Sequence, residues 1–168
     1  MGSLYNYINS KEDIIYFVYD YITTILRKEV VEAIEHVNDP QKRLRAALKQ
    51  NLDSVYRHQD VVMFIYKAST FLSRESLHEV LSQETEYIHL FEDLLRDYFG
   101  KQDINEDRIR LAADLLTYIP VIMTFRRWSL RRRFENMDSV MQDILSFIFH
   151  SIEFVLEKKA PDEPWDSN

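Results

Sequence analysis

The sequence contains no cysteine among its 168 residues, and it has only two glycines and four prolines. The absence of cysteine excludes a disulfide framework, a thiolate metal site and a cysteine nucleophile. Folds rich in sheets and turns need glycine and proline at their turns, so the scarcity of both indicates long helices joined by short connections. Because a chain of this length can bury one substantial core, we expect one compact all-α domain.

The sequence also lacks a basic charge balance and a long apolar run. Its net charge of −7 argues against a surface that wraps nucleic acid along its whole length, although a local basic patch can still bind DNA. The longest apolar stretch, residues 111–125, is interrupted by Asp114 and Pro120 and is too short to span a bilayer. No signal-peptide pattern is present, so we expect a cytoplasmic protein with no membrane partner.

Apolar side chains recur at helical spacing in six segments. They predict helices over residues 10–36, 39–58, 61–70, 73–99, 105–133 and 138–158. Short polar side chains stand at the expected N-caps of four of these helices, namely Ser10, Asp39, Asn105 and Asp138.

Pro120 lies inside the fifth predicted helix. It cannot donate an amide hydrogen, and its ring crowds the carbonyl group of Leu116, so we expect a kink there. The kink either opens a gap for a ligand or merely fits the packing. Asp114, in the same apolar stretch, needs a partner or a place at an edge because an unpaired buried charge is costly.

The beginning of the chain carries its most specific motif. The pattern Gly2-Ser3-Leu4-Tyr5-x-Tyr7-Ile8-x-Ser10-Lys11-x-Asp13 resembles the closing segment of the helix-turn-helix in TetR-family transcriptional repressors. In that family the recognition helix enters the major groove. The resemblance implies that Gly2 and Ser3 approach base edges. It also implies that Tyr5 and Tyr7 touch the DNA backbone and that Lys11 neutralises a phosphate.

The same resemblance implies a TetR-like regulatory bundle of six to seven helices that dimerises through the last two. Residues 1–9 are then the remnant of the recognition helix, residues 10–159 the ligand-binding and dimerisation domain, and residues 160–168 a polar, disordered tail. Two helices that precede the motif in the family are missing from this sequence. We therefore expect weak operator binding by this chain, although its intact parent would bind operator DNA.

A repressor of this type senses a small-molecule effector in an apolar cavity between helices. We expect an apolar or amphipathic molecule, and large soft side chains are the candidate lining, although plain core is their more common use. The tyrosines are the most informative, because each brings a hydroxyl group that needs a partner if buried. The candidates are Tyr56, Met63, Phe64, Tyr66, Phe71, Tyr87, Phe91, Tyr118, Met123, Phe125 and Trp128.

The only concentrated basic stretch, residues 126–133, contains five arginines. Arginines near the C-terminus of a helix are favourable in their own right, because they face the negative end of its dipole. Alternatively, Arg127 or a neighbour holds an anionic ligand by bidentate contacts. Because some TetR-like regulators bind fatty acyl-coenzyme A, such a molecule is one candidate effector.

The final predicted helix carries two apolar rows rather than one. A monomer needs only one such face, so the surplus row predicts a homodimer in which the last two helices of each subunit form a four-helix bundle. The alternative is a monomer with a deeply buried central helix. The candidate interface residues are Val140, Met141, Ile144, Phe147, Ile148 and Phe154.

Catalytic signals are weak in this sequence. The five histidines form no metal-type pair, and the two Glu-x-x-His motifs, at 75–78 and 86–89, share one predicted helix, whereas a di-metal bundle needs them on separate helices. We therefore expect no enzyme and no cofactor. An all-helical dimeric protein-interaction adaptor without DNA binding is the main alternative to the repressor, and a helical metal-bundle enzyme is the third hypothesis.

Overall fold

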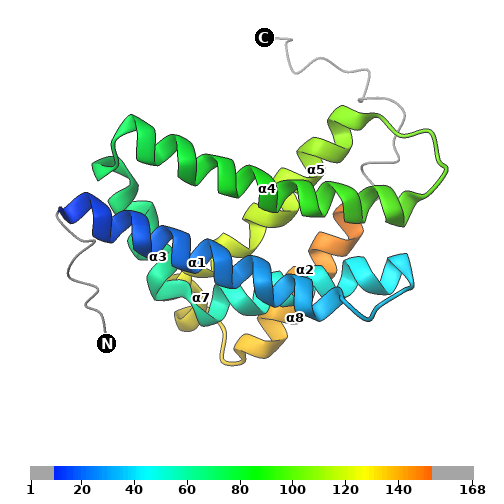
Figure 1. Ribbon diagram of the computed structural model, residues 1–168. Helices are drawn as coiled ribbons and strands as arrows, with labels where there is room; N and C mark the ends of the chain where they lie inside the picture. Colours follow the sequence, from blue (N-terminus) through cyan, green and yellow to red (C-terminus); the bar gives the residue numbers. More distant parts are fainter. Residues whose placement is uncertain (1–9, 153–168) are drawn as a thin grey trace, which may run out of the picture.

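The computed structural model describes residues 10–152, and helices dominate this range without any strand (Figure 1). The prediction of an all-α fold is thereby confirmed. Along the chain the elements are α1 (Lys11–Ile34), α2 (Pro40–Arg57), α3 (Gln59–Ala68), η2 (Ser69–Phe71), α4 (Arg74–Phe99), α5 (Glu106–Tyr118), η3 (Ile119–Val121), α6 (Ile122–Phe125), α7 (Arg127–Arg133) and α8 (Met137–Ser151).

Local capping chemistry sets the boundaries of the first helices. At the start of α1 the hydroxyl group of Ser10 accepts a 3.0 Å hydrogen bond from the amide of Asp13, whose carboxylate accepts one from the amide of Ser10. This reciprocal pair is a capping box. The carboxylate of Asp39 caps α2 by accepting a 2.8 Å hydrogen bond from the amide of Lys42, and Pro40 stands at the first helical position. Gly100 ends α4 with φ of +61°, which a residue with a side chain rarely adopts.

The fifth predicted helix is interrupted, as Pro120 indicates, but the change is larger than a kink. The α-helix ends at Tyr118, and the chain continues through the 3₁₀ turn η3 into the short helices α6 and α7. The cause is the missing amide hydrogen of Pro120, which ends the backbone hydrogen-bond ladder at this point.

The cap of α8 differs from the prediction by two residues. Asn136, not Asp138, is the N-cap, because its side-chain oxygen accepts hydrogen bonds of 2.9 and 3.2 Å from the amides of Asp138 and Ser139. The expected continuation of this helix to residue 158, and the tail at 160–168, lie outside the described residues.

Three apolar clusters make up the interior of residues 10–152, and two of them lie along the long helices, while the smallest surrounds Met123. The larger one joins the C-terminal halves of α1 and α4 to α2, α5 and α8, around the fully buried Phe91 and Leu48. The smaller one joins the N-terminal halves of α1 and α4 to α3 and η3, around Ile22 and Val80. The long helices α1 and α4 run side by side and span both clusters (Figure 1).

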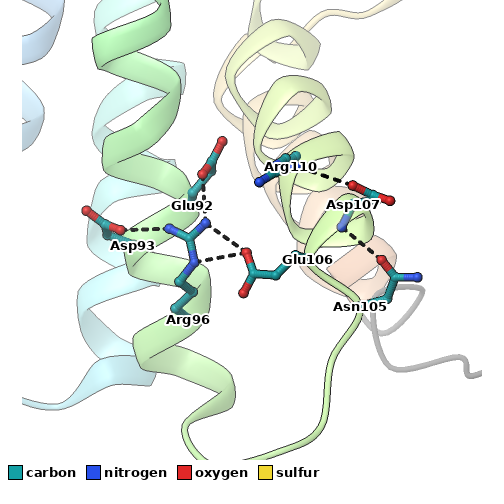
Figure 2. A network of polar contacts seen from close by, with 7 residues as sticks. All are labelled: Glu92, Asp93, Arg96, Asn105, Glu106, Asp107 and Arg110. Atoms are coloured by element: carbon teal, nitrogen blue, oxygen red, sulfur yellow. Dashed lines mark hydrogen bonds and ion pairs between the residues drawn. The ribbon is translucent and has the colours of Figure 1, made fainter.

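Arg96 fastens the connection between α4 and α5 (Figure 2). Its guanidinium group donates hydrogen bonds of 2.8 Å to Glu92, 2.8 Å to Asp93 and 2.9 Å to Glu106. The hydrogen bond from Arg96 lowers the pKa of Glu106, the first residue of α5. The turn at residues 100–105 is thus closed by one cation shared among three carboxylates.

Glu29 provides a second polar connection, between α1 and α2. Its carboxylate accepts a short hydrogen bond from the buried hydroxyl group of Ser54 and a 2.7 Å bond from Arg57. Gln50 donates a longer one, of 3.4 Å. Burial by itself would raise the pKa of Glu29, but the Ser54 hydroxyl, the Arg57 charge and the nearby His58 outweigh it and lower the pKa.

We predict that Glu29→Gln destabilises the protein by about 1–2 kcal/mol at pH 7, because the acceptor of this charge-assisted network loses its negative charge. The pKa is lowered by folding, so this contribution is fully present above the ordinary value of 4.5 and is lost as the pH falls below it. Urea unfolding at pH 7 and at pH 4 measures the difference. Glu32→Gln, which alters an exposed pair with Lys28, is the control. If the difference in unfolding free energy between wild type and Glu29→Gln is no smaller at pH 4 than at pH 7, the assignment is contradicted.

Candidate functional site: an apolar pocket between the long helices

A cavity of about 580 Å³ lies between α1, α3, α4 and α5, a size within the range of small-molecule sites. Its walls are mostly aliphatic and aromatic, and most of the smaller apolar cluster takes part in them. The lining consists of Tyr19, Ile22, Thr23, Leu26, Asn51, Val55, Val62, Ile65, Tyr66, Ser69, Leu77, Leu81, Glu84, Tyr87, Ile88, Asp114, Leu115, Thr117, Tyr118 and Val121.

Asn51 of α2 forms the polar floor of this pocket. Only 1% of the residue is exposed. Its amide nitrogen lies 3.5 Å from the carbonyl oxygen of Leu116, the group that Pro120 leaves without its helical donor. Its side-chain oxygen accepts a 3.0 Å hydrogen bond from the hydroxyl group of Tyr87. Asn51 thereby links α2, α4 and the broken end of α5 at one point.

The pocket lining also brings tyrosine side chains together with one carboxylate. The hydroxyl group of Tyr19 donates a short hydrogen bond to Glu84. The ring of Tyr66 meets that of Tyr118 edge to face, with 6.2 Å between the centroids. Burial raises the pKa of Tyr19 and of Tyr66, and Glu84 adds to both shifts. These hydroxyl groups therefore remain protonated and act as hydrogen-bond donors at physiological pH.

The pocket opens to the surface between α4 and α5. Leu81, Leu115 and Tyr118 all line it, yet they are 47%, 47% and 56% exposed. Asp114 is also exposed, so it lies at an edge, one of the two positions expected from its charge. In the single subunit the pocket is therefore open to solvent at these side chains.

The structure places three of the predicted ligand residues, Tyr66, Tyr87 and Tyr118, on the pocket wall. The other candidates lie elsewhere. Phe91 and Met123 are fully buried in the apolar clusters, and Phe125 packs against the outer face of the Tyr66 ring, 5.2 Å away. Outside the lining also lie Tyr56, Met63, Phe64, Phe71, Arg127 and Trp128.

The basic stretch and the DNA-contacting candidates lie away from the pocket. Arg127 forms an ion pair with Asp60 at the start of α3, and the Trp128 side chain is exposed. The ammonium group of Lys11 lies 4.2 Å from the centre of the Phe71 ring. The other four predicted DNA contacts, Gly2, Ser3, Tyr5 and Tyr7, fall outside the described residues.

The predicted dimer residues of α8 divide into two groups. Val140 and Ile148, 8% and 0% exposed, pack inside the subunit, while Met141 and Ile144 are partly buried beside them. Phe147 points to solvent and is 67% exposed. Phe154 lies outside the described residues. Val140 and Ile148 are therefore core residues of the subunit. Val140 packs with Leu52 of α2 and Met123 of α6, and Ile148 belongs to the larger cluster.

Sequence reasoning missed most of the polar lining. Asn51 falls within the apolar stripe of its helix and looks like a core position, and Glu84 falls among charged residues that look like a solvated face. The one available signal was Asn51, an amide in an otherwise apolar stripe. A buried amide must find hydrogen-bond partners, so such a position indicates a polar contact inside the protein.

No three histidine, aspartate or glutamate side chains converge into a metal-holding group among residues 10–152. In the same range, no helix is both long and apolar enough to cross a lipid bilayer.

Comparison with known proteins finds a matching family model and a similar solved structure. A family model described as "Tetracyclin repressor-like, C-terminal domain" matches residues 37–120, half of the chain. The fold is similar to that of AibR, whose crystal structure is in complex with isovaleryl coenzyme A and operator DNA. The TM-score is 0.63 at 16% sequence identity, over 90% of this chain and 78% of AibR. No curated protein matches the sequence.

We predict that Asn51→Leu destabilises the protein by about 2 kcal/mol, because the Leu116 carbonyl and the Tyr87 hydroxyl both lose their partner. Pro120→Ala supplies an amide hydrogen that can serve the same carbonyl. The cost of Asn51→Leu should therefore be smaller by about 1 kcal/mol in the Pro120→Ala background. Urea unfolding of the four proteins of this double-mutant cycle measures the coupling, and strictly additive effects would refute the link.

Proposed function

This chain belongs to the tetracyclin repressor-like, C-terminal domain family, and from that premise we propose that it is the effector-sensing part of a transcriptional repressor. A small apolar or amphipathic molecule enters the pocket between α1 and α4 and changes the position of the DNA-reading segment. The observation that carries the proposal is that the same two helices line the pocket and are joined at their N-terminal ends.

Glu12 makes that joint between α1 and α4. Its carboxylate accepts a 2.8 Å hydrogen bond from the amide of Ser73, the N-cap of α4, and another of 2.8 Å from the hydroxyl group of Ser76. The hydrogen bonds from Ser73 lower the pKa of Glu12, so the carboxylate stays charged. A ligand that separates α1 from α4 at the pocket therefore also acts on this joint, next to the proposed DNA-contacting residues 2–11.

The proposed assembly is a homodimer. A row of exposed apolar side chains continues from α5 through η3 into α6, at spacings of three and four residues that keep it on one helical face. Phe147 of α8 is a further exposed apolar side chain. Large exposed apolar patches mark association surfaces. The row consists of Leu111, Leu115, Tyr118, Ile122 and Phe125, so a partner subunit bound there would also cover the pocket mouth at Leu115 and Tyr118.

Within the class of apolar or amphipathic effectors, a fatty acyl-coenzyme A is a more specific prediction. The apolar walls suit an acyl chain, but no lysine, arginine or histidine lines the pocket to hold the phosphate groups of the coenzyme. The coenzyme head would have to lie outside the mouth, beyond Leu81 and Leu115.

We predict that N-phenyl-1-naphthylamine, a neutral fluorescent probe, binds this protein saturably in the pocket. Leu115→Trp should weaken binding by about tenfold, because the larger ring fills the mouth, and an exposed position tolerates the change. Leu111→Trp, one helical turn away on the same exposed row but outside the lining, should leave affinity unchanged. The measurement is a fluorescence titration. Equal affinities for both variants, or no saturable binding, would favour the adaptor alternative.

We predict that light scattering after size exclusion gives a dimer of the 20.2 kDa chain, and that Phe147→Glu shifts it toward monomer. A charge buried in an apolar interface opposes association. Tyr21→Glu, at an exposed aromatic position on α1, is the matched control and should remain dimeric. A monomeric wild-type protein would contradict the proposed assembly.

A further inference from the structure

Both charged side chains that line the pocket are acidic. Glu84 lies on α4 and Asp114 on α5, and the lining contains no basic residue. Neither carboxylate forms an ion pair with a lysine, arginine or histidine within residues 10–152. Arg110, four residues before Asp114 on α5, forms its ion pair with Asp107 instead.

Glu84 is half-buried, and its partners leave its charge uncompensated. The hydroxyl group of Tyr19 donates to it. Burial raises the pKa of Tyr66, and the charge of Glu84 raises it further, so the hydroxyl group of Tyr66 also stays neutral. Neutral donors solvate a carboxylate but do not cancel its charge. A charge partly removed from water is stabilised by an opposite charge, so this side of the pocket suits a ligand that carries a cation.

The aromatic side chains of the pocket suit the same kind of ligand. Tyr19, Tyr66, Tyr87 and Tyr118 line one cavity, and the faces of such rings attract cations while their carbon surface favours apolar groups. We propose that the pocket selects a hydrophobic cation, with Glu84 as the principal counter-ion and Asp114 as a second carboxylate at the mouth. This inference rests on the proposed function, because it specifies the chemical class of the effector.

The binding test uses three molecules that share a ten-carbon tail, namely decyltrimethylammonium, 1-decanol and decanoate, titrated calorimetrically into the full chain below micelle-forming concentrations. We expect decyltrimethylammonium to bind about tenfold more tightly than 1-decanol, and decanoate to bind more weakly than either. Cation binding that is no tighter than that of 1-decanol would overturn the inference while leaving the proposed effector pocket intact. Failure of all three molecules to bind would overturn both.

The charge test uses Glu84→Gln, which keeps the shape of the side chain. This variant should lose most of the preference for decyltrimethylammonium and keep the affinity for 1-decanol. Glu86→Gln, on the same helix but outside the pocket, is the matched control and should bind like wild type. Asp114→Asn, at an exposed position that does not endanger folding, should lose a smaller part of the preference. An undiminished cation preference in both Glu84→Gln and Asp114→Asn would refute the assignment.

Discussion

The structure depends on one missing backbone donor in the middle of the protein. Pro120 has no amide hydrogen, so the carbonyl group of Leu116 cannot complete the ladder of its own helix. Asn51 of α2 supplies the replacement donor, and the same side chain accepts a hydrogen bond from Tyr87 of α4. A donor from α2 thus serves the carbonyl group of α5, and α4 holds that donor in place through Tyr87. These contacts fix the relative positions of the three helices at the floor of the pocket.

The pocket lies where the interior changes from one apolar cluster to the other. The clusters occupy opposite halves of α1 and α4, and the broken helix changes direction between them. A continuous straight helix through Pro120 would keep packing against its neighbours in one direction. The turn η3 instead leaves space beside Val121, and the long helices that border this space are joined at their N-terminal ends by Glu12.

The pocket lining contains carboxylates but no basic residue, and this sets the electrostatic character of the pocket. The arginine stretch, which could have served an anionic ligand, begins after the chain has turned away through α6, and Arg127 pairs with Asp60 there. The carboxylate of Glu84 remains beside neutral tyrosines. In a partly dry site this imbalance discriminates among ligands more strongly than the apolar walls, which accept any tail of suitable size.

The sequence by itself determined the helices, because periodicity and caps such as Ser10, Asp39 and Gly100 are chemistry between residues close in the chain. It also located the interruption at Pro120, since a missing amide hydrogen is a local property. Only the tertiary structure decided that Asn51 repairs that interruption and that Glu84 faces the pocket. Helical periodicity shows which side chains share a face, but the neighbour that each face meets depends on packing between residues distant in sequence.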